Sequence, residues 1–283
     1  MKYLLLILLW IFSLLPIQIL YLISKIIRFI VYDILCYREK VVIDNIQNTF
    51  IEKSQTKVIK LKNNFYDYFF ELIVEIIKLL SISNDELNKR FTFSNINVIK
   101  QSLKQNKSVI VVVGHYGNWE WALRSASNLI DTKIVGVYKR INNTIFEWLL
   151  LKIRSNTNVL PVEIKSLSRE LVNNKEKKIY AIVADQSPTL EQSNVRINFL
   201  NRDTLVYTGV EKISKKYNMP VFYLNTKLIR KGYYESTFEE ICSKNINGKN
   251  LEITKEFFSK LEKQIKSEPR LWLWSHKRWK HTN

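Results

Sequence analysis

A histidine and a glutamate five residues apart, His115 and Glu120, are the residues of this 283-residue chain best suited to acid–base chemistry. They belong to the segment 114–120 (GHYGNWE), which follows a run of β-branched residues at 108–113 typical of a buried strand. Ligands bind beyond the carboxyl ends of strands in open α/β sheets, so this segment lies where chemistry is expected. A carboxylate on one ring nitrogen would fix the tautomer and make the other nitrogen more basic. We therefore predict that His115 is a general base oriented by Glu120, with a substrate hydroxyl as nucleophile.

The spacing of these two residues sets a condition on the local structure. Residues five apart on one helix point about 140° away from each other. The two side chains can therefore meet only if His115 lies on a turn and Glu120 on the first helical turn, with Gly117 and Asn118 making the turn and capping the helix. The alternative is a turn histidine and a solvated carboxylate favoured by the helix dipole, and the spacing alone leaves both interpretations open.

The rest of the chain predicts the elements that would position this motif. Residues 41–90 have a helical pattern, and from residue 108 onwards strands and helices alternate. The expected strands are 108–113, 132–137, 159–162, 178–184, 197–200 and 220–228, and the expected helices are 118–128, 144–154, 167–174, 208–217 and 254–266. Such an alternation predicts an α/β fold with a mixed, largely parallel sheet flanked by helices.

The N-terminus predicts membrane attachment. Residues 3–24 contain no charged side chain, and about 20 apolar residues can cross the hydrocarbon core of a bilayer. A secretory signal peptide is the rival interpretation, but the segment continues into Lys25 and Arg28 rather than a small-residue cleavage site. Pro16 would kink a helix, which leaves a tilted or re-entrant insertion open. We predict a membrane anchor over 1–35 and a catalytic domain over 36–283 on the cytoplasmic side, where the basic residues lie.

The overall charge predicts an anionic partner. The chain has 44 Lys and Arg against 26 Asp and Glu, a net charge of +18. Nucleic acid, an anionic bilayer and an acidic protein all fit such an excess, but no nucleic-acid-binding module is present, and the apolar N-terminus favours the membrane. Cys36 and Cys242 form neither a metal-like nor a redox-like pair, so we expect no disulfide framework and no metal.

Several segments, in order along almost the whole chain, resemble one protein family. The segment 114–120 resembles the His-x4-Asp/Glu motif of glycerolipid acyltransferases and, more closely, the form found in the late acyltransferases of lipid A biosynthesis. The segments 37–45, 138–143, 184–186, 199–209 and 272–280 resemble blocks of the same family. The chain departs from the family's pattern at Asn201, at Ser187-Pro188 and in the segment 138–143, which lacks the proline of the corresponding family block. These departures bear on the substrate more than on the type of reaction.

The resemblance implies an enzyme of the inner membrane. It would move a fatty acyl chain from acyl-acyl carrier protein, with acyl-CoA as the lesser option, to a hydroxyl of a lipid A precursor, without a cofactor. Both the carrier protein and a phosphorylated lipid are acidic, which suits the basic excess of the chain. Three alternative functions remain. The first is the same acyl transfer to another glycolipid, to a phospholipid or to an amine. The second is a non-catalytic membrane scaffold, and the third is a hydrolase. The hydrolase is the weakest, because no Gly-x-Ser-x-Gly elbow is present.

The resemblance also assigns substrate-binding roles to Asn118, Arg140, Asp185, Gln186 and Arg202. Arg140 could bind an anionic head group or, like the amides at the helix start, stabilise an oxyanion, and the alternative is an ordinary surface arginine. Asp185 and Gln186 end the neighbouring strand and could shape the same cleft, although an aspartate there could simply form a turn. Arg202 suits a phosphate because its guanidinium is planar.

The C-terminal segment 272–280 (WLWSHKRWK) allows two interpretations. Its tryptophans and basic residues could form a belt at the membrane interface, or they could pack against the domain. We favour the interfacial belt. His276 has no carboxylate nearby in the sequence, so we expect it to be structural.

Overall fold

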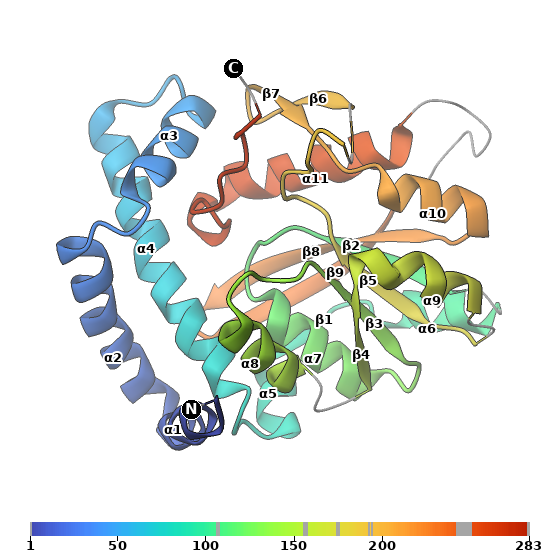
Figure 1. The fold of residues 1–283 in the computed structure, drawn as a ribbon, viewed down its shortest axis with the longest axis horizontal. Coiled ribbons are helices and arrows are strands. Elements are labelled where there is room, and N and C mark those ends of the chain that lie inside the picture. Colours follow the sequence, from blue (N-terminus) through green and yellow to red (C-terminus); the bar gives the residue numbers. More distant parts are fainter. Residues whose placement is uncertain are drawn as a thin grey trace.

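The computed structural model describes residues 2–105, 108–154, 158–173, 176–191, 193, 195–241 and 251–281. Within these residues seven strands form one sheet in the order β1-β9-β8-β2-β5-β3-β4, and two more form the hairpin β6-β7 (Figure 1). The strands are β1 (Phe91–Phe93), β2 (Val109–Val113), β3 (Ile134–Tyr138), β4 (Val159–Glu163), β5 (Ile179–Val183), β6 (Arg196–Phe199), β7 (Arg202–Leu205), β8 (Val221–Arg230) and β9 (Tyr233–Ile241).

The sheet is mixed and mostly parallel, as the sequence predicts. Strands β8, β2, β5, β3 and β4 run parallel to one another, whereas β9 runs antiparallel to β8 and carries β1 at the edge. Strands β1, β7 and β9 are not among the strands expected from the sequence. From Tyr233 to Phe238 of β9 every second residue is buried, a period-two pattern that the charged and hydroxyl residues of this strand obscure in the sequence.

Helices cover both faces of the sheet (Figure 1). The helices are α1 (Lys2–Leu14), α2 (Ile17–Arg28), α3 (Glu39–Thr49), α4 (Gln55–Lys78), α5 (Asn84–Arg90), α6 (Asn97–Lys104), α7 (Trp119–Leu129), α8 (Thr144–Arg154), α9 (Leu167–Asn173), α10 (Gly209–Tyr217) and α11 (Glu252–Ser267). Helices α1, α2 and α3 pack on α4 at one side of the sheet. Helices α6 and α7 lie on one face, and α10 and α11 lie on the other, where Phe257 packs edge-on against Tyr223 of β8. The central strand β2 is therefore buried on both sides, which explains its continuous run of β-branched residues.

The apolar N-terminus forms two helices rather than one. Helix α1 ends at Leu14 and α2 begins at Ile17, because Pro16 has no backbone N–H to donate and its ring disfavours a helical conformation at the residue before it. Lys78 of α4 donates hydrogen bonds to the carbonyls of Ser13 and Leu15 at this break, at 2.7 and 2.9 Å. In the described part of the chain, no helix combines the length and the apolar character needed to cross a bilayer. The continuous apolar helix expected over 3–24 is thus not found.

The C-terminal tryptophans are core residues. Trp272, Trp274 and Trp279 are only 2%, 0% and 7% exposed, and their rings contact one another edge-on around Trp272. The expected interfacial belt is therefore wrong, and the packing alternative holds. The basic residues of this segment do not all face outward as a belt requires, because Arg278 is itself buried in this cluster and donates to the carbonyl of Leu205.

Candidate active site

The turn that follows β2 carries His115, and two glycines allow it to form. A Cβ on Gly114 would lie 2.7 Å from a methyl group of Leu261, so any other residue here would force this buried side chain of α11 to shift. Gly117 has a φ of +65°, a left-handed conformation that glycine adopts without strain. The turn is pinned by the C-terminal segment, because Gly117 N–H donates to the carbonyl of Leu271 and the amide of Leu273 donates to the carbonyl of His115, both at 3.0 Å.

His115 is held by Asp185, which ends the neighbouring strand. Val113 of β2 and Val183 of β5 are directly paired in the parallel register, so the residues two positions further on also lie side by side. The His115 Nδ1 and Asp185 Oδ1 atoms are 2.6 Å apart, and the backbone amide of His115 donates to Oδ2 at 3.0 Å. The spacing of the motif predicts Glu120 as this carboxylate; the structure places Asp185 there, 70 residues away in sequence.

Asp185 is buried and negatively charged. Burial alone would raise its pKa, but the proximity of His115 and hydrogen bonds from His115 and the Trp272 indole lower the pKa of the Asp185 carboxyl to about 2. An ionised carboxylate only accepts hydrogen bonds, so the proton in this contact belongs to Nδ1 of the imidazole. The other ring nitrogen, Nε2, is then the basic one, and it lies 3.2 Å from the Gln186 side-chain amide nitrogen.

His115 and Gln186, the residue that contacts Nε2, both line a cavity of about 250 Å³ at the carboxyl ends of three neighbouring strands. Its lining includes His115, Gln186, Arg154 and the residues that follow β3, Lys139 and Arg140. Trp119 packs the edge of its indole against the His115 ring, with the ring centroids 5.0 Å apart. We refer to this space as the polar cavity.

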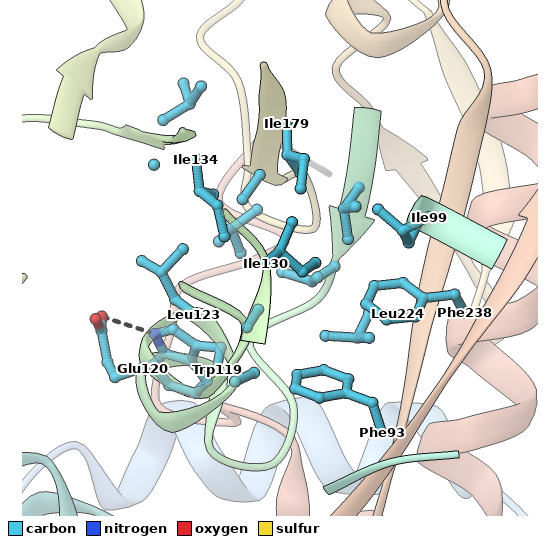
Figure 2. A pocket seen from close by; sticks show the side chains of 18 of the residues that line it. Phe93, Ile99, Trp119, Glu120, Leu123, Ile130, Ile134, Ile179, Leu224 and Phe238 are labelled. Atoms are coloured by element: carbon cyan, nitrogen blue, oxygen red, sulfur yellow. Dashed lines mark hydrogen bonds between the residues drawn. The ribbon is translucent and has the colours of Figure 1, made fainter. Parts of the chain in front are cut away.

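Glu120 makes a different ion pair. It lies on the first turn of α7, as the sequence predicts, but Arg154 at the end of α8 binds both of its carboxylate oxygens. The Trp119 indole N–H also donates to it, at 3.1 Å (Figure 2). Burial would raise the pKa of Glu120, but the charge and hydrogen bonds of Arg154 outweigh burial and lower it. Glu120 is thus an ionised carboxylate whose oxygens bind Arg154 and Trp119, with no hydrogen bond to His115.

A second, apolar cavity adjoins the first. Trp119, Val137, Arg154 and Val183 line both spaces, and Glu120 and Arg154 are the charged residues in the lining of the apolar one. Figure 2 shows Glu120 and Trp119 on one side of this cavity and Phe93, Leu224 and Phe238 on the other. The remaining lining comes from the sheet and from α6 and α7: Ile99, Val111, Val113, Ala122, Leu123, Ala126, Ile130, Ile134, Gly136, Ile179 and Ala181.

Two comparisons bear on what this arrangement is. A family model for bacterial lipid A biosynthesis acyltransferases matches residues 1–281. The chain belongs to that family. A search of curated proteins finds no relative that matches it. Membership makes the chain an acyltransferase of lipid A biosynthesis and confirms the family that its motifs resemble.

The other predicted site residues of this acyltransferase divide into two groups. Arg140, 69% exposed, lies on the rim of the polar cavity beside Glu147, and Gln186 lines the same cavity. Asn118 is fully buried, and its side chain caps α7 and donates to Glu75. The oxygen and the nitrogen of its side-chain amide are therefore both hydrogen-bonded inside the protein. Asn118 stabilises the turn and does not point toward a substrate.

Arg202 lies outside the lining of both cavities of the acyltransferase. It forms an ion pair with Asp44 at 3.0 Å and stacks over the Trp279 ring, with its guanidinium carbon 4.5 Å from the ring centroid. Its contacts join α3, β7 and the C-terminal segment. The predicted phosphate contact of Arg202 therefore has no counterpart among the residues that line the site.

Arg154 and Trp272, which donate hydrogen bonds to Glu120 and Asp185, are not among the site residues predicted from the sequence. The pattern of residues 144–154 marks Arg154 only as the end of a helix, and the composition of 272–280 favours a membrane contact for Trp272. A basic residue in the last turn of a helix usually complements the helix dipole, so nothing local distinguishes Arg154. Among the described residues, which do not include Cys242, no group of three His, Cys, Asp or Glu side chains could hold a metal ion.

Proposed function

We propose that this protein transfers a fatty acyl chain from the thioester of an acyl-acyl carrier protein to a hydroxyl of a lipid A precursor, with His115 as the general base. The observation that carries the proposal is an imidazole that is held by a buried, ionised carboxylate and lines a polar cavity adjoining an apolar one. A general base needs the first feature, and a fatty acyl substrate needs the second.

The reaction balances with His115 as a proton shuttle. Nε2 removes the proton from the acceptor hydroxyl as its oxygen attacks the thioester carbonyl carbon. The tetrahedral intermediate then expels the carrier's sulfur, which takes the proton back from His115 and leaves as a thiol. Asp185 stabilises the imidazolium that exists between these two transfers and keeps Nδ1 protonated throughout.

Glu120 and Arg154 form the second pair of the proposed mechanism. Arg154 lines both the polar cavity, which His115 also lines, and the proposed acyl pocket. A fixed positive charge there would stabilise the oxyanion that develops on the thioester carbonyl. Glu120 holds the guanidinium in place through two hydrogen bonds, so we assign Glu120 a supporting electrostatic role through Arg154.

The apolar cavity is the proposed site of the fatty acyl chain. Each methylene group that this pocket removes from water contributes about 0.8 kcal/mol to holding the donor thioester beside His115. Phe93 and Phe238 stack with ring centroids 5.3 Å apart on the side of the cavity away from Glu120 (Figure 2). We propose that this aromatic pair limits the length of the chain that fits.

The basic rim of the polar cavity suits both acidic substrates. Lys139 and Arg140 lie where the head group of a phosphorylated acceptor or the acidic surface of a carrier protein would approach. Acyl transfer to another glycolipid, a phospholipid or an amine would use the same catalytic groups. The acceptor must therefore be identified by measuring acyl transfer to each of these compounds.

The N-terminal helices are the proposed contact with the cytoplasmic face of the inner membrane. Helix α1 exposes a set of large apolar side chains, namely Tyr3, Leu4, Ile7, Leu8, Trp10, Ile11 and Leu14. Exposed apolar patches of this size mark sites that contact membranes or proteins. Tyr3 packs edge-on against Trp148 of α8, and the exposed Phe146 lies on the same helix, whose residues line the polar cavity. A bilayer that receives α1 would therefore lie close to the site, where a lipid acceptor enters.

The test uses the full chain purified in detergent, with acyl-carrier-protein donors of several chain lengths and a lipid A precursor. We expect transfer to the precursor and its loss, by a factor of about 10² or more, in His115→Ala. His281→Ala, which removes an imidazole outside the lining of both cavities, is the matched control. Unchanged transfer by His115→Ala would overturn the mechanism, and a folded protein without transfer to any acceptor would favour the scaffold.

A further inference from the structure

A buried carboxylate outside both cavities joins three parts of the fold. Glu75 of α4 is 1% exposed, and each of its oxygens accepts hydrogen bonds from other elements. The Tyr21 hydroxyl of α2 donates to Oε1 at 2.6 Å. The Asn118 amide and the Tyr234 hydroxyl of β9 donate to Oε2, both at 2.8 Å.

The contact with Asn118 leads directly to the catalytic turn. The other end of the Asn118 side chain accepts a hydrogen bond from the Trp121 amide at 2.9 Å and so caps the first turn of α7. The backbone carbonyl of Glu75 also accepts from the Trp121 indole at 2.8 Å. Trp119 and Glu120, which line the site, follow this cap, so the position of Glu75 fixes where α7 begins.

The contact with Tyr21 leads to the apolar N-terminal helices. One face of α2 packs on α4 through Ile17, Leu20 and Tyr21, while Ile19 and Leu22 remain exposed. Gly232 has a φ of +69°, and a Cβ there would collide with the Tyr21 hydroxyl. The turn between β8 and β9 therefore leaves space for this hydroxyl to reach Glu75.

We infer that Glu75 is a positioning residue for acyl transfer, which acts through Asn118 and couples the seating of helix α2 on α4 to the geometry of the turn that carries His115, Trp119 and Glu120. This inference rests on the proposed function. It adds a residue outside the site and a route by which the state of the N-terminal helices reaches the reacting groups.

The hydrogen-bonding chemistry explains why an acceptor is required at this position. Asn118 and both tyrosines approach as donors, and an ionised carboxylate accepts from all three. If Glu75 is protonated, its single O–H can be accommodated only where a partner can turn round and accept. A tyrosine hydroxyl can do so, whereas the Asn118 NH₂ group cannot. The proton therefore points toward Tyr21 or Tyr234, and the bond to Asn118 survives in both states.

The surroundings of Glu75 place its ionisation near neutral pH. Burial raises the pKa of Glu75, the hydrogen bonds from Tyr21, Tyr234 and Asn118 oppose this, Glu71 on the same helix raises it further, and the result is about 7. Tyr21, Tyr68 and Tyr234 face it with their pKa values raised by burial, so all three stay neutral. Arg90 of α5, paired with Glu86, acts on Tyr21 and lowers the pKa of that phenol slightly against burial.

The test compares variants at Glu75 with matched removals of its partners. Glu75→Gln can place its carbonyl oxygen toward Asn118 and its NH₂ group toward Tyr21, so we expect kcat within about threefold of the unsubstituted protein (roughly 0.6 kcal/mol). Glu75→Leu leaves Asn118 without its acceptor. A misplacement of about 1 Å can cost about 10²-fold in rate, so we expect kcat to fall by ten- to a hundredfold while KM for the donor changes little.

Tyr21→Phe and Tyr234→Phe each remove one hydroxyl from Glu75, from α2 and from β9 respectively. We expect Tyr21→Phe to weaken the dependence of activity on phospholipid vesicles, and Tyr234→Phe to leave it unchanged. The kcat values are taken from protein shown to be folded by near-UV circular dichroism. A folded Glu75→Leu variant with unchanged kcat, or equal vesicle dependence in the two tyrosine variants, would overturn the inference. His115→Ala is assayed alongside, because its full activity would instead overturn the proposed function.

Discussion

The contact between His115 and Asp185 gives the sharpest test of the site. In Asp185→Asn the amide has nearly the same size as the carboxylate but no charge, so the fold around Trp272 is retained. The imidazolium of the proposed mechanism would then lose its counter-charge. The amide introduced at this position could also present its NH₂ group to Nδ1, which would move the ring proton to Nε2 and remove the base.

The size of the effect follows from the geometry. Two unit charges about 4 Å apart interact by about 4 kcal/mol at an effective dielectric constant of about 20. The Nδ1–Oδ1 distance of 2.6 Å and the burial of Asp185 justify a separation of this order between the charge centres. Each 1.4 kcal/mol is about a factor of ten in rate, so we expect kcat to fall by about 10³. The KM for the acyl donor should change little, because Asp185 lies behind the histidine.

The assay measures kcat and KM together with the imidazole tautomer. The chain has three histidines, so ¹⁵N-labelled histidine gives ring signals that can be assigned by substitution. In the unsubstituted protein Nδ1 of His115 should carry the proton. Asp185→Asn should lower kcat and shift this tautomer, whereas the control Glu120→Gln should lower kcat without changing it. A tautomer that responds to Glu120→Gln and not to Asp185→Asn would refute the assignment of Asp185 as the orienting group.

Three further predictions concern the pocket, the membrane face and pH. Phe93→Leu should shift donor preference toward longer chains and Leu224→Phe toward shorter ones, each extra buried methylene changing kcat/KM by about fourfold, measured in competition between donors. Leu8→Asp should reduce sedimentation with anionic vesicles and leave the melting temperature nearly unchanged, because Leu8 is exposed; equal sedimentation would contradict the proposed role of α1. The folded-state pKa of Glu75 is about 7 against an ordinary 4.5, so its stabilising contribution is complete below about pH 4.5 and is lost as the pH rises through 7. We expect the free energy of unfolding in urea to fall between pH 5 and pH 8 by about 2–3 kcal/mol more in the unsubstituted protein than in Glu75→Gln. An equal fall in the two proteins would contradict a buried charge on Glu75.

Much of the fold follows from the local pattern of the sequence. The strands around 108–113 and 178–184 and the helices around 144–154 and 208–217 lie close to their predicted bounds, because buried β-branched runs and helical periodicity are local signals. The position of His115 at a strand end was predictable for the same reason. Strand β9 escaped because its polar composition hides a period-two pattern.

The partner of each charged group was decided only by tertiary structure. Sequence spacing offered Glu120 to His115, but β2 and β5 are neighbours in the sheet although β3 and β4 lie between them in the sequence. The parallel register of these two strands then brings Asp185 onto the ring. Glu120 instead pairs with Arg154 at the end of α8. No local sequence pattern indicates that α8 lies beside α7.

The sequence by itself determined that this chain is an α/β acyltransferase with a histidine at the end of a buried strand and an apolar N-terminus, since motifs and hydrophobic periodicity are written in neighbouring residues. Tertiary structure alone decided which carboxylate orients that histidine, where the C-terminal tryptophans pack, and how Glu75 joins α2 to α7. The physical reason is that side-chain hydrogen bonds and ion pairs act over about 3 Å. Which groups come within that distance depends on strand order and helix packing, and a single sequence does not state either one.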